Sequence, residues 1–379
     1  MPRPYRAVIA ASSHAADDHS AHDKKKFTAT NRASIPAGVR FIDLFCGIGG
    51  FRFATESAAR RVGLETRCVF SSDIDAPCRK AYAANFGESP AGDITQVAVE
   101  TVPDHDLLLA GFPCQPFSII GKMRGFEDTR GTLFFDIARI LEAKKPSAFV
   151  LENVKLLAGH NQGRTLRRIL ETLTALGYTV EQRVLNALHY GLPQKRERIW
   201  IVGHRSPTGK IHWPAGGVPM KPLAALLERK VPRKFFASDH IRSRRWAVLK
   251  PTKEPTIWHE NKAGHISAYP YSCALRAGAS YNYLLVNGER RLTPREMLRL
   301  QGFPEHFCIA CNDSQTRRQA GNSLPVNVAE AVIHGLLTGL GWGEAIKPYP
   351  ETNPSAAHQL ALMEKKVPYH ANPTPKKRR

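Results

Sequence analysis

Short runs of mostly apolar residues recur along the first 205 positions of the chain, and each run ends at glycine, proline or charged residues. Such runs are typical of strands that a parallel sheet buries on both faces. Stretches with apolar residues at helical spacing lie between several of the runs. This alternation predicts an α/β fold with a mostly parallel sheet. The expected strands lie at about 39–45, 67–71, 107–110, 147–151, 179–185 and 199–203.

The helices of the first half are predicted from the same pattern. One is expected from about Phe51, and another is expected to end at about Gly87. A third has its apolar face at Leu133, Ile137, Ile140 and Leu141. A fourth, which we expect Gly177 to end, has its apolar face at Leu166, Ile169, Leu170, Leu173 and Leu176.

The helical pattern returns towards the C-terminus. Residues 293–296 have the sequence TPRE, which predicts a capping box with proline in the first turn of a helix. This helix is expected to end near 302–304. Asn322 and Ser323 are predicted to cap a final helix whose apolar face comprises Val326, Ala329, Ile333, Leu336 and Leu337.

The stretch 206–290 has a different character, because prolines, aromatic residues and basic residues crowd together there without a helical period. We predict a small, irregular, β-rich domain of short strands and loops at 206–290. It would interrupt a larger domain whose two parts lie at 39–205 and 291–342. Residues 1–38 are expected to form a disordered extension, and 343–379 a basic, proline-rich tail.

Charge is the strongest signal in the composition. The 379 residues include 54 Lys and Arg against 33 Asp and Glu, which gives a formal net charge of +21. Residues 205–300 alone carry 18 basic and 6 acidic side chains. Such an excess favours a polyanionic partner, and basic residues interleaved with aromatic ones favour nucleic acid. A solvated basic surface is the simpler alternative for the same residues.

The cysteines and the hydrophobic segments favour a cytoplasmic protein. Seven cysteines at irregular spacing do not resemble a disulfide framework and suit a reducing compartment. No apolar run is long enough to span a bilayer, and none has the form of a secretory signal. Cys308 and Cys311 form one CxxC pair without a second pair, so we expect no metal site.

Cys114 lies in the most distinctive stretch of the chain, residues 111–118 with the sequence GFPCQPFS. The stretch directly follows the strand expected at 107–110, and ligands of open α/β sheets bind beyond the carboxyl ends of such strands. Prolines on both sides restrict the backbone and would present the thiol from a stiff loop. We interpret Cys114 as a candidate nucleophile, and a small buried side chain in a turn is the alternative.

A glycine-rich turn follows the first expected strand. Residues 43–50 have the sequence DLFCGIGG and lead into a helix, an arrangement that holds nucleotide-like cofactors because glycine lets the backbone approach them closely. The dinucleotide fingerprint GxGxxG is incomplete, since Arg52 takes the place of its third glycine. Asp73 follows the second strand, where an acidic residue can bind ribose hydroxyls. Asp75 is expected to cap the next helix.

Charged residues also mark the later strand ends. Glu152 ends the strand expected at 147–151 and would lie beside Cys114 if the two strands are neighbours. A solvated glutamate at a strand end is an equally simple interpretation. Arg196 and Arg198 alternate onto the same side of the chain, and paired arginines suit phosphates or the edges of bases.

In their order along the chain, these stretches resemble the motifs of the DNA (cytosine-5) methyltransferases, in particular the small bacterial restriction–modification type. The matches are a cofactor turn, a nucleophile loop, the acidic motif ENV, the motif QxRxR and two C-terminal motifs, at 43–50, 112–118, 152–154, 194–198, 291–303 and 321–323. The resemblance implies the Rossmann-like α/β sheet of S-adenosylmethionine-dependent methyltransferases, with helices on both faces. It also implies that the domain at 206–290 recognises the target.

The resemblance implies S-adenosylmethionine as the cofactor, with S-adenosylhomocysteine as its product, and no metal. Phe45 would stack on the adenine, Ile74 would pack on it, and Gly47 and Gly49 would admit the methionine part. Asp73 would hold the ribose, although the family more often has glutamate there. The other residues that the resemblance assigns to the cofactor pocket are Asp93, Ile94, Pro113, Leu133, Asn322 and Ser323.

The same resemblance implies a covalent mechanism. The thiolate of Cys114 would add to carbon 6 of a cytosine, so that carbon 5 can accept a methyl group. Glu152 would hydrogen-bond to N3 and the exocyclic amine, Arg198 would hold O2, and Arg196 would bind a nearby phosphate. Because this chemistry cannot reach a base inside a duplex, the cytosine would be flipped out.

DNA contacts are expected from the basic domain and from the loop after Cys114, which has glycines at its flanks and suits a closing lid. Ile120 stands where many relatives have a polar residue, so we expect an apolar wedge there. Ala274 and Leu275 stand where many relatives have Thr-Leu. The loop residues expected to contact DNA are Gln115, Ser118, Ile120, Lys122 and Arg124.

The sequence therefore predicts a sequence-specific cytosine C5-methyltransferase that acts on double-stranded DNA as a monomer, associated with the nucleoid through DNA. It would be the modification half of a restriction system whose endonuclease acts on the same site without binding this chain. An RNA cytosine methyltransferase is one alternative, which the large basic insert disfavours. An inactive DNA-binding protein would not need Cys114 or Glu152. A nicotinamide dehydrogenase would need the missing third glycine.

Overall fold

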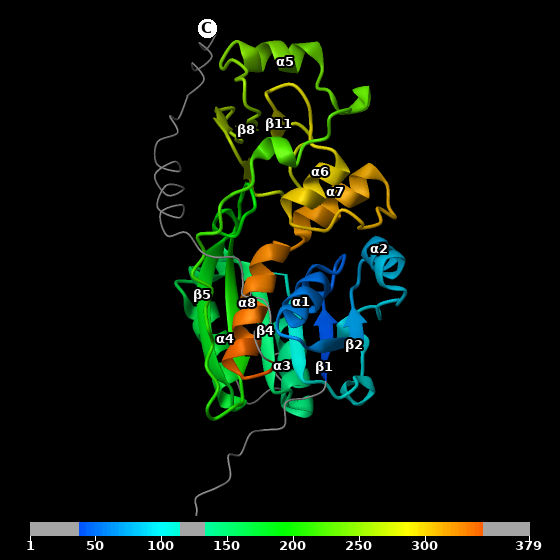
Figure 1. The fold of residues 1–379 in the computed structure, drawn as a ribbon, viewed down its shortest axis with the longest axis vertical. Helices are drawn as coiled ribbons and strands as arrows, with labels where there is room; N and C mark the ends of the chain where they lie inside the picture. The colour runs from blue at the N-terminus through cyan, green and yellow to red at the C-terminus, as the bar shows by residue number, and fades with distance from the viewer. Residues whose placement is uncertain (1–37, 114–132, 344–379) are drawn as a thin grey trace, which may run out of the picture. The chain divides into compact units, whose positions relative to one another are not determined.

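The computed structural model describes residues 38–113 and 133–343, which belong to one compact unit of the chain, 35–379. Its largest element is a six-stranded sheet in the order β2-β1-β3-β4-β7-β5 (Figure 1). The strands are β1 Gly38–Leu44, β2 Glu65–Ser72, β3 Leu107–Gly111, β4 Ala148–Val154, β5 Thr179–Asn186 and β7 Glu197–His204. β2, β1, β3 and β4 are parallel, and β7 is antiparallel to both of its neighbours. The predicted α/β fold with a mostly parallel sheet is confirmed.

Helices cover both faces of this sheet, as the buried side chains of its strands show. Successive residues of a strand point to opposite faces. Phe41 and Leu109 belong to the core that includes α1 and α8, whereas Ile42 and Leu108 belong to the core that includes α3 and α4. Figure 1 shows α8 beside α1. These helices and α2 are α1 Gly50–Arg61, α2 Ala76–Phe86, α3 Leu133–Lys144, α4 Arg164–Ala175 and α8 Val326–Gly339.

The chain after β7 first stays with the large sheet. The backbone N–H of Lys210 donates to the carbonyl of Gly339, and that of His212 donates to Gly335, so this segment lies along α8. A side chain at Gly335 would meet the carbonyl oxygen of His212 at 1.9 Å, which explains why glycine is required at this close approach.

A second, smaller sheet follows in the order β11-β8-β9. The short strands expected at 206–290 are therefore present, namely β8 Ile257–Glu260, β9 Ile266–Tyr269, β10 Ser272–Cys273 and β11 Leu284–Val286. β10 pairs with β6, Gln194–Lys195, in a separate two-stranded sheet, and so contacts the chain just before β7. The expectation of no helix here was wrong, because α5 spans Asp239–Trp246. Its polar sequence has no apolar stripe, and the buried Arg245 pairs with Glu260 on β8.

Three helices end the described chain. α6, Pro294–Leu300, begins with the predicted capping box between Thr293 and Glu296. α7, Asp313–Asn322, was not predicted. The prediction that Asn322 and Ser323 cap the final helix was wrong, because Asn322 is the last residue of α7 and Pro325 precedes α8. The predicted apolar face of α8 is buried. No described helix is long and apolar enough to cross a membrane.

Candidate active site

A cavity of about 820 Å³ opens at the carboxyl ends of the parallel strands, the edge at which the sequence predicts ligand binding. Its size is typical of sites for small molecules and cofactors. The turn after β1, the ends of β2, β3 and β4, and the start of β7 line one part of it. Segments 275–278 and 319–324 line the rest, so residues far apart in the sequence meet there.

The turn after β1 has the backbone that its glycines predict. Phe45 and Gly47 have φ angles of 54° and 55°, in the left-handed region that favours glycine. Both residues line the cavity, and a side chain at Gly47 would meet no atom within 4 Å. Gly49 is different, since a Cβ there would lie 2.2 Å from the ring of Phe86. Gly49 packs against Phe86 and is not among the residues that line the cavity, so its contact with the cofactor stays a prediction.

Asp73 fixes the turn through its carboxylate. Its Oδ2 accepts from the N–H of Gly47 at 2.8 Å, and its Oδ1 accepts from the N–H of Asp75 at 2.8 Å. Burial raises the pKa of Asp73, although both backbone donors oppose this shift. Asp75 itself caps α2 by accepting from the N–H of Cys78, as predicted. Asp73 therefore lines the cavity with lone pairs still free for a hydroxyl ligand.

The remaining walls of this part of the cavity fit a nucleoside-like cofactor. Ile74 is 72 % exposed, which is unusual for a large apolar side chain and leaves it free to cover a planar ring. The hydroxyl of Ser72 is buried and has no partner among the described residues. The predicted cofactor residues found along the same cavity are Phe45, Gly47, Asp73, Ile74, Asp93, Ile94, Pro113, Leu133, Asn322 and Ser323.

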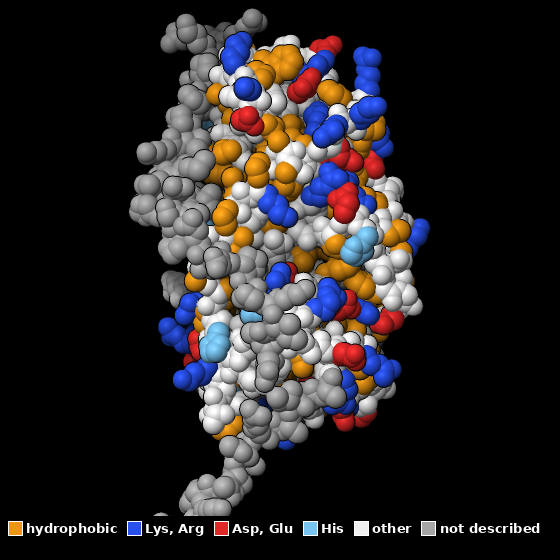
Figure 2. Space-filling model, viewed as in Figure 1, with side chains coloured by type: hydrophobic (Ala, Val, Ile, Leu, Met, Phe, Trp, Pro, Cys, Tyr) orange, Lys and Arg blue, Asp and Glu red, His pale blue; other side chains and the backbone are white. Residues whose placement is uncertain are grey.

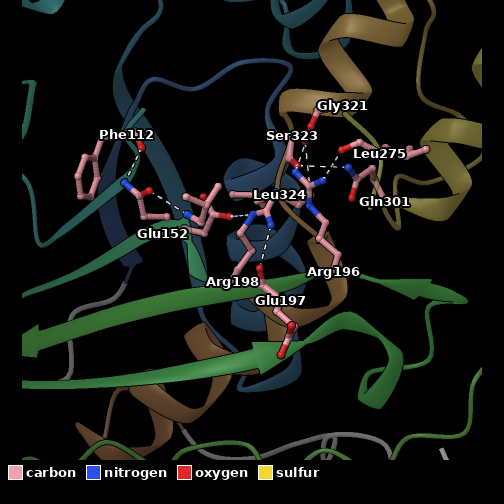
Figure 3. Close-up of polar contacts among 12 residues, drawn as sticks. Phe112, Glu152, Arg196, Glu197, Arg198, Leu275, Gln301, Gly321, Ser323 and Leu324 are labelled. Carbon is pink, nitrogen blue, oxygen red and sulfur yellow. Dashed lines mark hydrogen bonds and ion pairs between the residues drawn. The ribbon is translucent and has the colours of Figure 1, made fainter. Parts of the chain in front are cut away.

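Glu152 and Arg198 form an ion pair on the opposite side of the cavity (Figure 3). The Nε of Arg198 lies 2.9 Å from Oε1 of Glu152, and both side chains are nearly buried. β3 and β4 are neighbours in the sheet, and Glu152 lies opposite Gly111. Burial raises the pKa of Glu152, while Arg198 and then Arg196 act to lower it. A carboxyl with a raised pKa and a fixed cationic neighbour is suited to acid catalysis.

Cys114 and the five loop residues predicted to contact DNA lie outside the described residues, so their positions remain predictions. The chain is described up to Pro113, which lines the cavity. The side-chain amide of Asn153 donates to the carbonyl of Phe112 at 2.9 Å, and its oxygen accepts from the N–H of Val154. The end of β4 thus holds the backbone two residues before Cys114.

Arg196 does not face the phosphate that the sequence predicts for it. Its side chain is 1 % exposed and donates to the carbonyls of Leu275, Gly321 and Ser323 (Figure 3). Alternation predicts that Arg196 and Arg198 share a side of the chain, but it cannot show that distant segments cover Arg196. The geometry favours a positioning role, in which Arg196 ties the segment at Leu275 to the end of α7.

Two buried glutamines extend this network, and sequence reasoning gave neither of them a role. Gln194 donates to the carbonyl of Leu300 and to Oε1 of Gln301, and its own Oε1 accepts from the N–H of Leu275 at 3.0 Å. Gln301 donates to the carbonyl of Ala320. Both side chains are fully buried. Buried polar groups of this kind are costly unless paired, so a satisfied network indicates a fixed wall.

The described residues contain no group of His, Cys, Asp and Glu side chains arranged to hold a metal. Cys311 instead receives a hydrogen bond from Gln319 and donates to the carbonyl of Pro77. The surface near the small sheet carries Lys and Arg side chains interspersed with Asp and Glu (Figure 2). Several of its arginines pair with local carboxylates, as Arg244 does with Glu260.

The sheet order, the glycine turn and the cavity together define an α/β protein with a cofactor-sized cavity at the carboxyl ends of its parallel strands. The chain belongs to the C-5 cytosine-specific DNA methylase family, whose model matches residues 39–234 and 228–337. The family resemblance predicted from the sequence and the enzyme class, DNA (cytosine-5) methyltransferase, are thereby confirmed.

Named relatives support this assignment over most of the chain. Type II methyltransferase M.NgoBI of Neisseria gonorrhoeae is 58 % identical over 295 residues, 76 % of this chain and 90 % of the relative. M.HaeII of Haemophilus aegyptius is 51 % identical, covering 79 % and 93 %. M.HhaI of Haemophilus parahaemolyticus is 38 % identical, covering 82 % and 97 %.

Solved structures support the fold. The S. pombe Dnmt2 methyltransferase matches with a TM-score of 0.61 at 21 % identity, covering 80 % of this chain and 99 % of that chain. The Entamoeba histolytica methyltransferase EhMeth also matches with a TM-score of 0.61, at 17 % identity over 80 % and 99 %. At these identities the likeness concerns the arrangement of strands and helices alone.

Proposed function

We propose that this chain methylates carbon 5 of a cytosine within a specific sequence of double-stranded DNA, with S-adenosylmethionine as donor. It would protect DNA from a restriction endonuclease that acts on the same site, in keeping with the type II names of its relatives. The observation that carries the proposal is the Glu152–Arg198 pair, which lies opposite Gly111 at the entry to the Cys114 loop. This pair shares one cavity with the glycine turn and Asp73.

The cofactor would occupy the part of the cavity beside β1 and β2. Asp73 would accept hydrogen bonds from the ribose hydroxyls, and Ile74 and Phe45 would enclose the adenine. Gly47 leaves open space where a side chain would obstruct the ligand. When bound, S-adenosylmethionine supplies an electrophilic methyl group and leaves as S-adenosylhomocysteine.

The cytosine would occupy the part of the cavity beside β4 and β7. The Cys114 thiolate forms a bond to carbon 6, and the electron pair of the 5,6 double bond moves towards carbon 5. Glu152 offsets the negative charge that develops in the ring by donating to N3, an effect worth roughly 10²–10⁴-fold. Arg198, already held by Glu152, donates to O2. Carbon 5 would use that electron pair to bond the methyl group that the donor supplies. A base would then take the carbon 5 proton, and its electron pair would restore the 5,6 double bond and expel the thiolate of Cys114.

A cytosine reaches these groups only outside the helix, at a cost of a few kcal/mol that protein contacts must offset. We assign these contacts to the loop after Cys114 and to a target-recognition domain at 206–290, between catalytic parts at 39–205 and 291–342. The separate sheet β11-β8-β9 supports this division. Lys210 and His212 are hydrogen-bonded to α8, so the part of the 206–290 domain that is separate from the large sheet begins after His212.

The experiment uses the purified chain, labelled donor and a genome fragment of known sequence. Bisulfite mapping should then reveal 5-methylcytosine at one position of one recurring sequence. A duplex with 5-fluorocytosine at that position should become covalently attached to wild-type protein when donor is present, because fluorine cannot leave as the proton does. The matched control is Cys114→Ser, which should form no adduct.

Two results would contradict the proposal. One is methyl transfer to transfer RNA without transfer to duplex DNA, which would indicate an RNA enzyme. The other is methylation of DNA by wild-type protein without formation of an adduct on 5-fluorocytosine. This result would contradict the covalent mechanism but not the enzyme class.

A further inference from the structure

Three arginines line the described part of the cavity, and their partners differ. Arg196 is buried and donates to three carbonyls. Arg198 is paired with Glu152. Arg276 is exposed and has no carboxylate partner among the described residues. Of these three side chains, Arg276 therefore has its charge available for an anionic ligand.

The side chain of Arg276 is exposed, but hydrogen bonds hold its own backbone N–H and the backbone of the residue before it. Its N–H donates to the hydroxyl of Tyr283 at 2.9 Å, and its guanidinium lies 5.0 Å from the centre of the Tyr283 ring. The preceding residue, Leu275, is held by Gln194 through its N–H and by Arg196 through its carbonyl. Such a cation–π contact limits where the guanidinium can point.

The end of α7 sets how close this segment lies to the cofactor part of the cavity. A Cβ at Gly321 would lie 2.5 Å from the backbone nitrogen of Ala277 and 2.8 Å from the carbonyl carbon of Arg276. The two backbones are thus in direct contact, and the next residues, Asn322 and Ser323, line the same cavity. Arg276 therefore belongs to the lining of the same cavity as Glu152 and Arg198, where we propose that the cytosine binds.

We propose that Arg276 binds the phosphate next to the flipped cytosine on the target strand, the role that the sequence assigns to Arg196. A base held by Glu152 and Arg198 keeps its sugar and phosphate towards the opening of the cavity. Guanidinium groups bind phosphate oxygens through two parallel hydrogen bonds, and Arg276 has no competing carboxylate in the described part of the chain. This inference rests on the flipped cytosine of the proposed function.

Salt dependence of DNA binding tests the proposal, because each neutralised phosphate contributes about 0.9 to the slope of log affinity against log salt concentration. Arg276→Ala should lower that slope by about 0.9, and Arg276→Lys should keep it. The matched control is Arg67→Ala, which removes an exposed arginine near the start of β2. The cavity lies at the other end of this strand, beside Ser72 and Asp73. It should leave the slope unchanged.

A neutral methylphosphonate beside the target cytosine identifies the phosphate. Wild-type protein should lose affinity on this duplex, and Arg276→Ala should lose nothing further. An unchanged salt slope for Arg276→Ala would overturn the proposal. So would relaxed preference at one flanking base pair, because that result indicates contact with a base edge. Wild-type protein is assayed for 5-methylcytosine formation in parallel. Absence of this product would contradict the proposed function, and this failure is distinct from a failure of the Arg276 proposal.

Discussion

Replacement of Arg196 distinguishes the two roles that sequence and structure give to this side chain. Arg196→Met removes the guanidinium but keeps an unbranched side chain that can fill much of the same space. Arg196→Lys keeps the charge but cannot reach three carbonyls in three directions. If Arg196 holds the wall of the cavity, both variants lose stability. If it binds phosphate, both should fold normally and only Arg196→Met should lose salt-dependent affinity.

The hydrogen bonds give the expected size of the effect. In Arg196→Met the carbonyls of Leu275 and Gly321 lose the donors at 2.9 and 3.1 Å, whereas that of Ser323 keeps Gln301 at 3.3 Å. Each buried carbonyl left without a partner costs about 1–3 kcal/mol. Part of this is offset because a buried cation no longer has to be desolvated, so we expect a net loss of about 2–4 kcal/mol.

Urea unfolding at neutral pH measures this loss, with an unchanged m value as the sign that the same surface is exposed. Arg196→Lys should lose less unfolding free energy than Arg196→Met but should still be less stable than wild type. The slope of log DNA affinity against log salt concentration should remain that of wild type for both variants. Wild-type stability of Arg196→Met, together with a slope lowered by about 0.9, would refute the positioning role and restore the phosphate contact.

Two further predictions concern the buried carboxyl groups of Glu152 and Asp43. Glu152→Gln should slow methyl transfer by about 10²–10⁴-fold in single-turnover assays while duplex affinity is retained, and an unchanged rate would exclude acid catalysis by Glu152. Asp43 is fully buried in β1, and burial raises its pKa well above the usual range. A raised pKa gives stability that is present below the unfolded-state pKa of about 3.9 and is lost as pH rises through the folded value. Asp43→Asn should therefore show a smaller loss of unfolding free energy with rising pH, and equal pH profiles of the two proteins would contradict this.

The positions of the strands along the chain and the sheet edge that carries the cavity were predictable because they depend on local pattern, whereas the order of the strands in the sheet was not predicted. The apolar strand expected at 107–110 precedes Cys114, and Glu152 lies on the neighbouring strand opposite Gly111, although that strand continues to Val154 rather than ending at 151. The cofactor turn was predictable for the same reason, since its glycines act through their own φ angles. The separate function of Gly49 was not, because it depends on the ring of Phe86, which lies 37 positions further along.

The helix that was missed at α5 and the one whose start was misplaced at α8 have different physical causes. α5 is a polar helix without an apolar stripe, and its buried arginine is stabilised by Glu260 on β8. The break between α7 and α8 depends on Pro325, which has no N–H to continue a helix. Local residues that favour capping, such as Asn322 and Ser323, are compatible with a helix end as well as with a helix start.

The burial of Arg196 has a consequence for how the wall of this cavity is held. Arg196 and Gln194 bind main-chain groups of segment 275–278, namely the carbonyl and N–H of Leu275, so their contacts do not depend on which side chains that segment carries. Gly321 likewise contacts backbone atoms of Arg276 and Ala277. The exposed side chain at position 276 is thus free to interact with DNA without disturbing the wall that holds it. A change at Arg276 should alter DNA binding alone, whereas a change at Arg196 should lower the stability of the wall.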